Sequence, residues 1–321
     1  MRFAAVERLT GKHPVRRLCR ALCVSVSGYY RWRQRGATRR VREDRQLKQR
    51  ILAVHMENRC VYGTPRIERA LRRQGIGTSR KRIARLRHEL GLQVKTRRRY
   101  KVTTQSKHAH PVAPNHLQRR FEAPRPNQIW VGDITYLETG EGWLYLAVIL
   151  DTFSRRIVGW EARQGLEREL PLAALNKALA ARRPAKGLLH HSDRGVQYCS
   201  HDYRQRLDAA GLVASMSRKG DCWDNAMVES FFKTLKGELG RRFTTRDEAQ
   251  RELFSYIEGF YNTRRLHSSL GYCSPAEYER LTARAEGAAA PAGASPGSWG
   301  RTSARLDPSS PPTPKRAGAT L

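Results

Sequence analysis

Hydrophobic and polar positions alternate in short runs through the middle of the chain, which is the two-residue period of β-strands. These runs are rich in β-branched and aromatic side chains and are separated by turn residues or helical stretches. Strands are expected at residues 129–137, 143–150, 157–162, 187–191 and 212–216, and helices at residues 170–181, 201–210 and 226–232. The order βββαβαβα predicts an α/β fold built on a mixed sheet, and ligands of such sheets gather at strand ends.

The first 94 residues have the three-to-four-residue period of amphipathic helices instead. Ser25 is expected to cap a helix over residues 26–34 that follows a helix over residues 15–22. Pro65 suits the first turn of a second helical pair, and Ser79 is expected to cap its second member. Each pair resembles a helix-turn-helix, so the N-terminal region is predicted to be all-α.

The helix after Ser79 has an apolar inner face and a basic outer face. Its outer face is expected to carry Arg80, Lys81, Arg82, Arg85 and Arg87. An arginine-lined second helix is what the major groove of DNA receives in helix-turn-helix proteins. Any three-helix bundle gives the same apolar period, so a bundle without DNA contacts is the alternative.

Composition divides the rest of the chain. Residues 95–126 are basic, contain prolines and lack a sustained period, so they are predicted to link residues 1–94 to a core of residues 127–282. Residues 283–321 are rich in Ala, Pro, Ser and Gly and hold few large apolar side chains. Such a tail buries too little surface to offset the entropy of ordering, so it is predicted to be disordered.

The charge of the chain indicates a polyanionic partner. It has 61 Lys and Arg against 29 Asp and Glu, a formal net charge of +32, and residues 1–100 alone have 29 against 6. This excess is typical of proteins that bind nucleic acid, although a solvated, ribosomal-type basic surface is the alternative. No run approaches the ~20 apolar residues of a membrane span, and no signal peptide is evident, so a cytoplasmic, nucleoid-associated location is expected. The 6 cysteines are scattered and are read as reduced thiols.

Three acids occupy positions where a carboxylate is costly: Asp133 within a strand, Asp193 directly after one, and Glu229 on an apolar helix. A buried, unpaired charge costs several kcal/mol or changes its protonation state. The three residues are far apart in the sequence and can meet only through the fold. Mg²⁺ suits such a set, because it takes a few carboxylate oxygens and fills its octahedron with water and substrate phosphate.

Each acid also has an ordinary explanation. Asp133 could be a strand-edge acid paired with an arginine, Asp193 a turn or cap residue, and Glu229 half of a surface pair with Lys233 four residues on. Asp151 and Asp224 are two further candidates, of which Asp224 is better explained as the N-cap of the helix that carries Glu229.

The motifs around the three acids resemble those of a known family. Asp-Ile-Thr-Tyr at 133–136, His-Ser-Asp-Arg-Gly-Val-Gln-Tyr at 191–198 and Asp-Asn-Ala-Met-Val-Glu-Ser-Phe-Phe-Lys-Thr-Leu-Lys at 224–236 are similar to the DDE motifs of bacterial insertion-sequence transposases related to retroviral integrases. The best match is the OrfB protein of the insertion-sequence-three family, with 35 residues between Asp193 and Glu229 and a Lys seven residues after Glu229. The resemblance extends to Tyr-Asn-Thr-Arg-Arg-Leu-His-Ser-Ser-Leu-Gly at 261–271 and covers about residues 10–282.

The resemblance implies a ribonuclease-H-like catalytic core and a function in DNA integration. Two Mg²⁺ ions, for which Mn²⁺ could substitute, would be held by Asp133, Asp193 and Glu229 and would clamp the oxygens of an in-line phosphoryl displacement. Lys233 and Lys236 would hold phosphates of the element end. Lys236 is expected to be exposed and about 10 Å along the helix from Glu229. The implied partners are terminal-repeat and target DNA, an upstream-frame OrfA protein or OrfAB fusion, and further copies of the chain.

Two rival functions remain at this point. A hydrolytic nuclease without strand transfer could use the same two-metal site. A DNA-binding regulator with an inactive core would not need the three acids.

Overall fold

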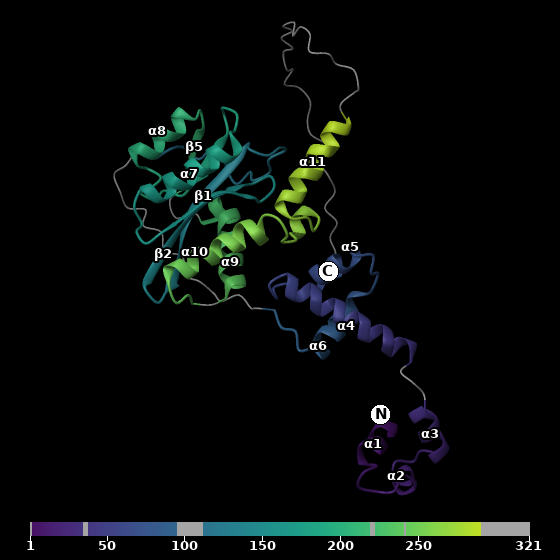
Figure 1. The fold of residues 1–321 in the computed structure, drawn as a ribbon. Coiled ribbons are helices and arrows are strands. Elements are labelled where there is room, and N and C mark those ends of the chain that lie inside the picture. Colours follow the sequence, from purple (N-terminus) through teal and green to yellow (C-terminus); the bar gives the residue numbers. More distant parts are fainter. Residues whose placement is uncertain (1, 35–37, 95–111, 219–221, 241, 290–321) are drawn as a thin grey trace. The chain divides into compact units, whose positions relative to one another are not determined.

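The computed structural model describes residues 2–34, 38–94, 112–218, 222–240 and 242–289 of the 321-residue chain (Figure 1). The described residues as far as Leu281 belong to one compact unit, and those from Thr282 onwards belong to another. No described helix is both long and apolar enough to cross a lipid bilayer.

A five-stranded mixed sheet forms the centre of the predicted core, which confirms the α/β class. Its strands are β1 (Ile129–Thr139), β2 (Gly142–Asp151), β3 (Ile157–Arg163), β4 (Leu189–Ser192) and β5 (Val213–Met216). The strand order is β3-β2-β1-β4-β5, with antiparallel pairing among β1, β2 and β3 and parallel pairing of β4 with β1 and β5. The central position of β1 places residues 130–132 between two hydrogen-bonded neighbours, β2 and β4.

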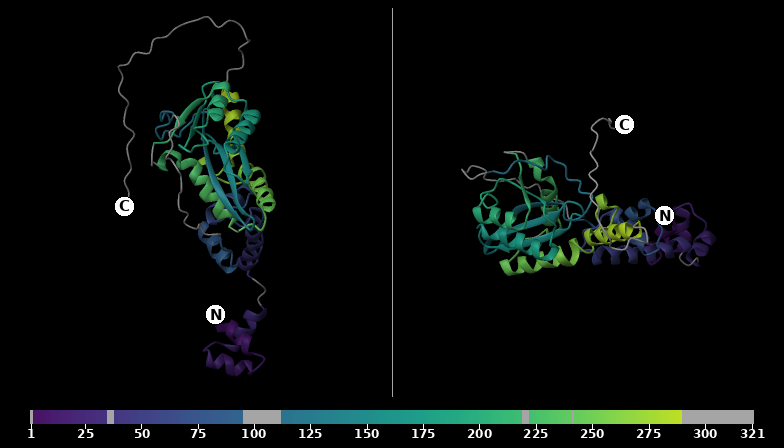
Figure 2. Two further views of the ribbon diagram at one scale, coloured as in Figure 1. Left: turned by 90° about the vertical axis from the view of Figure 1, so that its left-hand side faces the viewer. Right: turned by 90° about the horizontal axis from the view of Figure 1, so that it is seen from above.

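Helices cover both faces of this sheet (Figures 1 and 2). Trp130 of β1 packs in the cluster that includes α7 (Glu169–Arg182) and α8 (His201–Ala209). Val131 packs in the cluster that includes α9 (Ala226–Leu239) and α10 (Arg246–Tyr256). Because side chains alternate along a strand, the face of Val131 is also the face of Asp133.

The first helical unit consists of α1 (Arg2–Leu9), α2 (Val15–Ala21) and α3 (Val26–Gln34). Its core contains Val6, Leu18, Cys19 and Tyr29. The Ser25 hydroxyl accepts a hydrogen bond from the amide of Gly28 at 3.0 Å, which confirms the predicted cap. Helix α1 was not predicted, because its 8 residues are too few to show a helical period clearly.

The second helical unit consists of α4 (Arg39–Glu57), α5 (Thr64–Arg73) and α6 (Arg80–Glu89). Pro65 lies in the first turn of α5, and the Ser79 hydroxyl accepts from the amide of Arg82 at 3.3 Å, as expected. Helix α4 was missed, because its buried residues, although at helical spacing, lie only from Leu47 onwards, and the residues before Leu47 are mostly charged.

The remaining elements are η1 (Cys222–Asn225), η2 (Ile257–Tyr261), η3 (Ser268–Leu270) and α11 (Pro275–Ala289). The described part of the predicted linker packs on the core, since the amides of His116 and Leu117 donate to the Ser215 hydroxyl at 3.0 and 3.3 Å. Helix α11 includes the first residues of the predicted disordered tail, and residues 290–321 lie outside the described part of the chain. The domain boundaries therefore stay predictions.

Candidate active site

Asp133 lies on β1 opposite Val148 of β2, one residue past the pairing with β4, and none of the described arginines forms an ion pair with it, so the alternative of an arginine-paired acid does not hold. One of its carboxylate oxygens accepts a hydrogen bond from the amide of Ile134 at 2.8 Å. Its neighbour Gly132 is aligned with Ile149 of β2 and with Ser192 of β4, so ladders on both sides fix the backbone just before the carboxylate. This position gives the side chain a well-defined direction towards α9.

Asp193 is brought to Asp133 by the parallel pairing of β4 with β1. The register aligns Gly132 with Ser192, so Asp193 leaves β4 at the level of Asp133 on β1. Its Oδ1 accepts from the amide of Gly195 at 2.9 Å, which orients the carboxylate within the turn that follows the strand.

Glu229 lies in the first turn of α9, which packs against β1. Its Oε2 is 3.6 Å from the amine of Lys233, and the Glu229 side chain is 21% exposed. The i, i+4 pair is therefore present, as the ordinary explanation required. Glu229 nevertheless also acts electrostatically on Asp133.

Asp193 and Glu229 both act electrostatically on Asp133. Burial raises the pKa of Asp133 well above its ordinary value, and the charges of Asp193 and Glu229 raise it further. Among the residues that the structure describes, no group of three His, Cys, Asp or Glu side chains is close enough to hold a metal ion as it stands. The fold thus brings Asp193 and Glu229 near enough to repel the charge of Asp133, without closing the three acids into a finished set of ligands.

Lys236 differs from its expected position. Its amine lies 4.7 Å from the centre of the Tyr136 ring, in cation–π range, and the side chain is half-buried. Burial lowers the pKa of Lys236, and the charge of Asp133 opposes that shift. The expectation of an exposed lysine is therefore wrong, because Tyr136 of β1 contacts Lys236 in the third turn of α9.

Asp151 has a structural role. It is fully buried, and its oxygens accept from the amides of Asn127 at 2.7 Å and Phe153 at 3.0 Å. These bonds close the chain at the end of β2. Within the described residues, the interactions of this carboxylate do not involve the three acids.

Asp224 is not the N-cap of α9, contrary to expectation, since Asn225 occupies that position. Asp224 instead accepts from the guanidinium Nε atoms of Arg218 at 3.1 Å and Arg119 at 3.2 Å. The hydrogen bond from Arg218 is the main reason that the pKa of Asp224 falls to about 2. Its carboxylate joins the predicted linker and the loop after β5 to the start of α9.

Two further residues of the motifs lie near the acids. The side-chain amide of Asn225 donates to the backbone carbonyl of Gly132 at 3.3 Å, which connects the start of α9 to β1. Tyr198 is buried, and its pKa is raised first by burial and also by Asp133 and Asp193. Both residues stand inside the motifs at 191–198 and 224–236, so the sequence contained a signal for them.

The basic face of α6 is largely engaged within the protein. Arg82 and Arg85 donate to the two oxygens of Asp44 at 2.7 and 2.6 Å, and Arg80 donates to Glu68 at 3.2 Å. Lys81 is exposed and has no hydrogen bond or ion pair with any residue that the structure describes.

Arg87 was expected on the exposed face of α6, and this expectation is wrong. Arg87 is half-buried and donates to the Thr64 hydroxyl at 2.8 Å.

Comparison with known proteins defines the class. Residues 123–222 match the family model described as "Integrase core domain", and residues 210–275 match a second model of the same description. Residues 42–100 match the "HTH-like domain". A solved structure of the HTLV-2 integrase catalytic core domain in complex with magnesium matches with a TM-score of 0.40 and 16% identity, over 49% of this chain and 99% of that one. Along the sequence, the protein has a helix-turn-helix-like region followed by an integrase-type core.

Full-length relatives define the family. The chain is 40% identical to transposase InsF for insertion sequence IS3A of Escherichia coli strain K12, over 87% of this chain and 98% of that protein. It is 48% identical to the insertion element IS600 uncharacterized 31 kDa protein of Shigella sonnei, over 81% of this chain and 97% of that protein. The chain belongs to the IS3 family of transposases, and it is an enzyme of the polynucleotidyl transferase type.

Proposed function

We propose that this transposase uses Asp133, Asp193 and Glu229 as the ligands of two Mg²⁺ ions and carries out DNA cleavage and strand transfer at the ends of its element. Mn²⁺ would substitute for Mg²⁺ at the same carboxylates. The observation that supports the proposal most directly is that the fold brings Asp133 of β1, Asp193 just after β4 and Glu229 of α9 within electrostatic reach, since the last two both act on Asp133.

The chemistry of the donor set fits a divalent cation. Burial and two neighbouring carboxylates disfavour the anionic form of Asp133, and Lys236 is the cation that opposes them. When bound, divalent ions stabilise the charge that develops on the attacking and leaving oxygens of phosphoryl transfer.

The protein's own groups hold the acids in place. The Gly195 amide orients Asp193, and the bond between Asn225 and the Gly132 carbonyl fixes the start of the helix that carries Glu229. Lys233, exposed on the same helix, is available to a DNA phosphate. Lys236 acts closer to the reacting phosphate, because it is attracted by Asp133.

The reaction follows from the family. Water first frees a 3′-hydroxyl at the element end, and that hydroxyl then attacks another phosphodiester. No covalent protein intermediate is needed, since an in-line displacement requires only positioned oxygens and charge stabilisation.

Recognition of the element ends falls to the helix-turn-helix region. Lys81 is free to meet the backbone, while Asp44 holds Arg82 and Arg85 in fixed directions for base contacts. Arg80 is held by Glu68 and can contact DNA from the start of α6. Target DNA, an OrfA partner or OrfAB fusion, a homo-oligomer on DNA and a nucleoid-associated location belong to the same proposal and rest on membership of the family.

A labelled terminal-repeat duplex incubated with the full-length protein and Mg²⁺ tests the chemistry. Strand transfer predicts products longer than the substrate, in which one end is joined to a second DNA. A pre-cleaved end that terminates in a 2′,3′-dideoxynucleotide lacks the attacking hydroxyl and should give no joined product.

Shorter fragments without joined products would favour the hydrolytic nuclease. Specific binding without any cleavage would favour the inactive regulator.

A further inference from the structure

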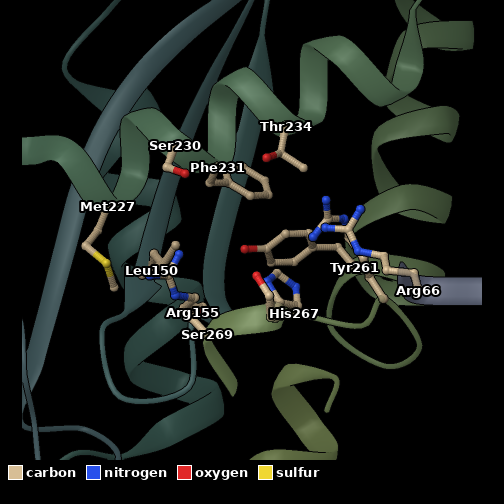
Figure 3. A pocket seen from close by; sticks show the side chains of 12 residues that line it. Arg66, Leu150, Arg155, Met227, Ser230, Phe231, Thr234, Tyr261, His267 and Ser269 are labelled. Carbon is tan, nitrogen blue, oxygen red and sulfur yellow. The ribbon is translucent and has the colours of Figure 1, made fainter. Parts of the chain in front are cut away.

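A small polar pocket lies beside α9, against Ser230 and Thr234 (Figure 3). Glu229 is on a different side of the helix. Ser230 is one residue past Glu229, which turns its side chain about 100° around the helix axis, and Thr234 lies one turn further on the same side. The cavity measures about 120 Å³, compared with the roughly 10–15 Å³ that one water needs. The pocket therefore has room for a small polyatomic group.

Three arginines from separate segments line this pocket: Arg66 of α5, Arg155 after β2, and Arg265 after η2. Arg265 is buried and forms an ion pair with Glu238, with its Nε 2.9 Å from Oε2. Arg66 donates its Nε to the carbonyl of Leu266 at 2.9 Å. Within the described part of the chain, neither Arg66 nor Arg155 forms an ion pair with an acid, so the pocket has an excess of positive charge.

His267 lies between these cations. It lines the pocket, is only 6% exposed, and its buried Nε2 has no hydrogen-bond partner among the described residues. Burial lowers the pKa of His267 to about 2, and the charges of all three arginines add to the shift. A buried polar atom without a partner is uncommon in native proteins and requires an explanation.

We propose that this pocket binds one phosphate group of a DNA backbone. This inference rests on the DNA-binding function proposed above and adds a contact away from the three acids and from the basic face of α6, to which the helix-turn-helix-like region contributes only Arg66. A phosphate oxygen would accept from the guanidinium groups of Arg66 and Arg155, from the Ser230 and Thr234 hydroxyls and from an imidazole N–H.

The small size of the pocket excludes a base or a nucleoside, so the contact positions the strand without reading its sequence. The phosphate would be held against the same helix that carries Glu229.

Arg155→Gln is the most informative variant. The Arg155 side chain is half-exposed and forms no hydrogen bond with another described residue. Its backbone is left-handed, with φ 60°, and the strain of this conformation is the same for Gln as for Arg. Arg183→Gln is the matched control, because Arg183 is an exposed arginine with φ 42° outside the pocket. Both changes remove one positive charge.

The affinity of each full-length protein for a terminal-repeat duplex is measured across a range of salt concentrations. Loss of one phosphate contact should reduce the log–log slope by about 0.9 in Arg155→Gln and leave it unchanged in Arg183→Gln. An equal slope in the wild type and Arg155→Gln would overturn the proposal.

A second arm separates DNA from free phosphate. Inorganic phosphate at constant ionic strength should raise the melting temperature of the wild type more than that of Arg155→Gln. If it does so while the DNA slopes stay equal, the pocket takes free phosphate and the DNA proposal fails. A slope that falls in Arg155→Gln, with no Mg²⁺-dependent joining by the wild type, would support the pocket and refute the proposed chemistry.

Discussion

Asp133→Asn should make the metal-free protein more stable while abolishing strand transfer. Burial and the two neighbouring acids raise the pKa of Asp133 above its value in the unfolded chain. The native state therefore binds more protons than the unfolded state between those two pKa values, and stability falls as pH rises through that window. The amide avoids this loss, and its oxygen can still accept the hydrogen bond from Ile134.

The expected gain follows from the cost of desolvating a poorly compensated group. That cost is about 1–3 kcal/mol, and each kcal/mol shifts the melting temperature by roughly 2–4 °C in a domain of this size. Melting curves of the full chain in a chelator at pH 7 should therefore place Asp133→Asn above the wild type. The difference should vanish at a pH below the unfolded pKa of aspartate.

Mg²⁺ should then raise the melting temperature of the wild type and leave that of Asp133→Asn nearly unchanged, because ligands that bind the native state stabilise it. Asp208→Asn, at an exposed acid on α8, is the control and should behave as the wild type in both experiments. A lower stability of Asp133→Asn in the chelator at pH 7 would refute the reasoning.

Three other changes test separate parts of the structure. Asp224→Asn should lower the melting temperature at pH 7, because the Asp224 carboxylate binds two arginines that hold its pKa at about 2. The stability that this carboxylate contributes should be lost as pH falls from about 4 towards 2, and melting curves across that range measure the loss. Asp44→Asn should release the two arginines of α6 and lower the ratio of specific to non-specific DNA affinity, whereas an unchanged ratio would mean that their orientation does not matter. Lys236→Met should destabilise the wild type more than it destabilises Asp133→Asn, since it removes the charge that opposes Asp133, and additive effects in this double-mutant cycle would contradict the coupling.

Much of the fold follows from local patterns in the sequence. The five strands were predicted from alternating or continuous apolar runs, and their bounds differ from the observed ones by at most a few residues. The caps at Ser25 and Ser79 were predicted because a hydroxyl just before an apolar period satisfies free helix amides. Helix α4 was not, because its buried side chains begin only at Leu47, after a mostly charged stretch.

The three acids were selected because a carboxylate in an apolar strand or helix needs a partner. Their proximity came from the parallel register of β1 and β4, which the sequence does not specify. The same limit explains the errors. Asp224 meets Arg119 from a segment 105 residues away, and Lys236 is half-buried because of residues on β1.

The pocket beside α9 depends even more on tertiary structure. Its arginines come from α5, the turn after β2 and the segment after η2, and none of them stands out in the sequence of so basic a chain.

Strand joining by single amide variants is the most direct measurement of the role of the three acids. The full-length protein is incubated with a pre-cleaved labelled element end, target DNA and Mg²⁺, and binding of the end is measured in parallel. We predict that Asp133→Asn, Asp193→Asn and Glu229→Gln bind the end as the wild type does and give no joined product, whereas Asp208→Asn joins normally. Joining at the wild-type level by any of the three amide variants would contradict the assignment of that carboxylate to the active site.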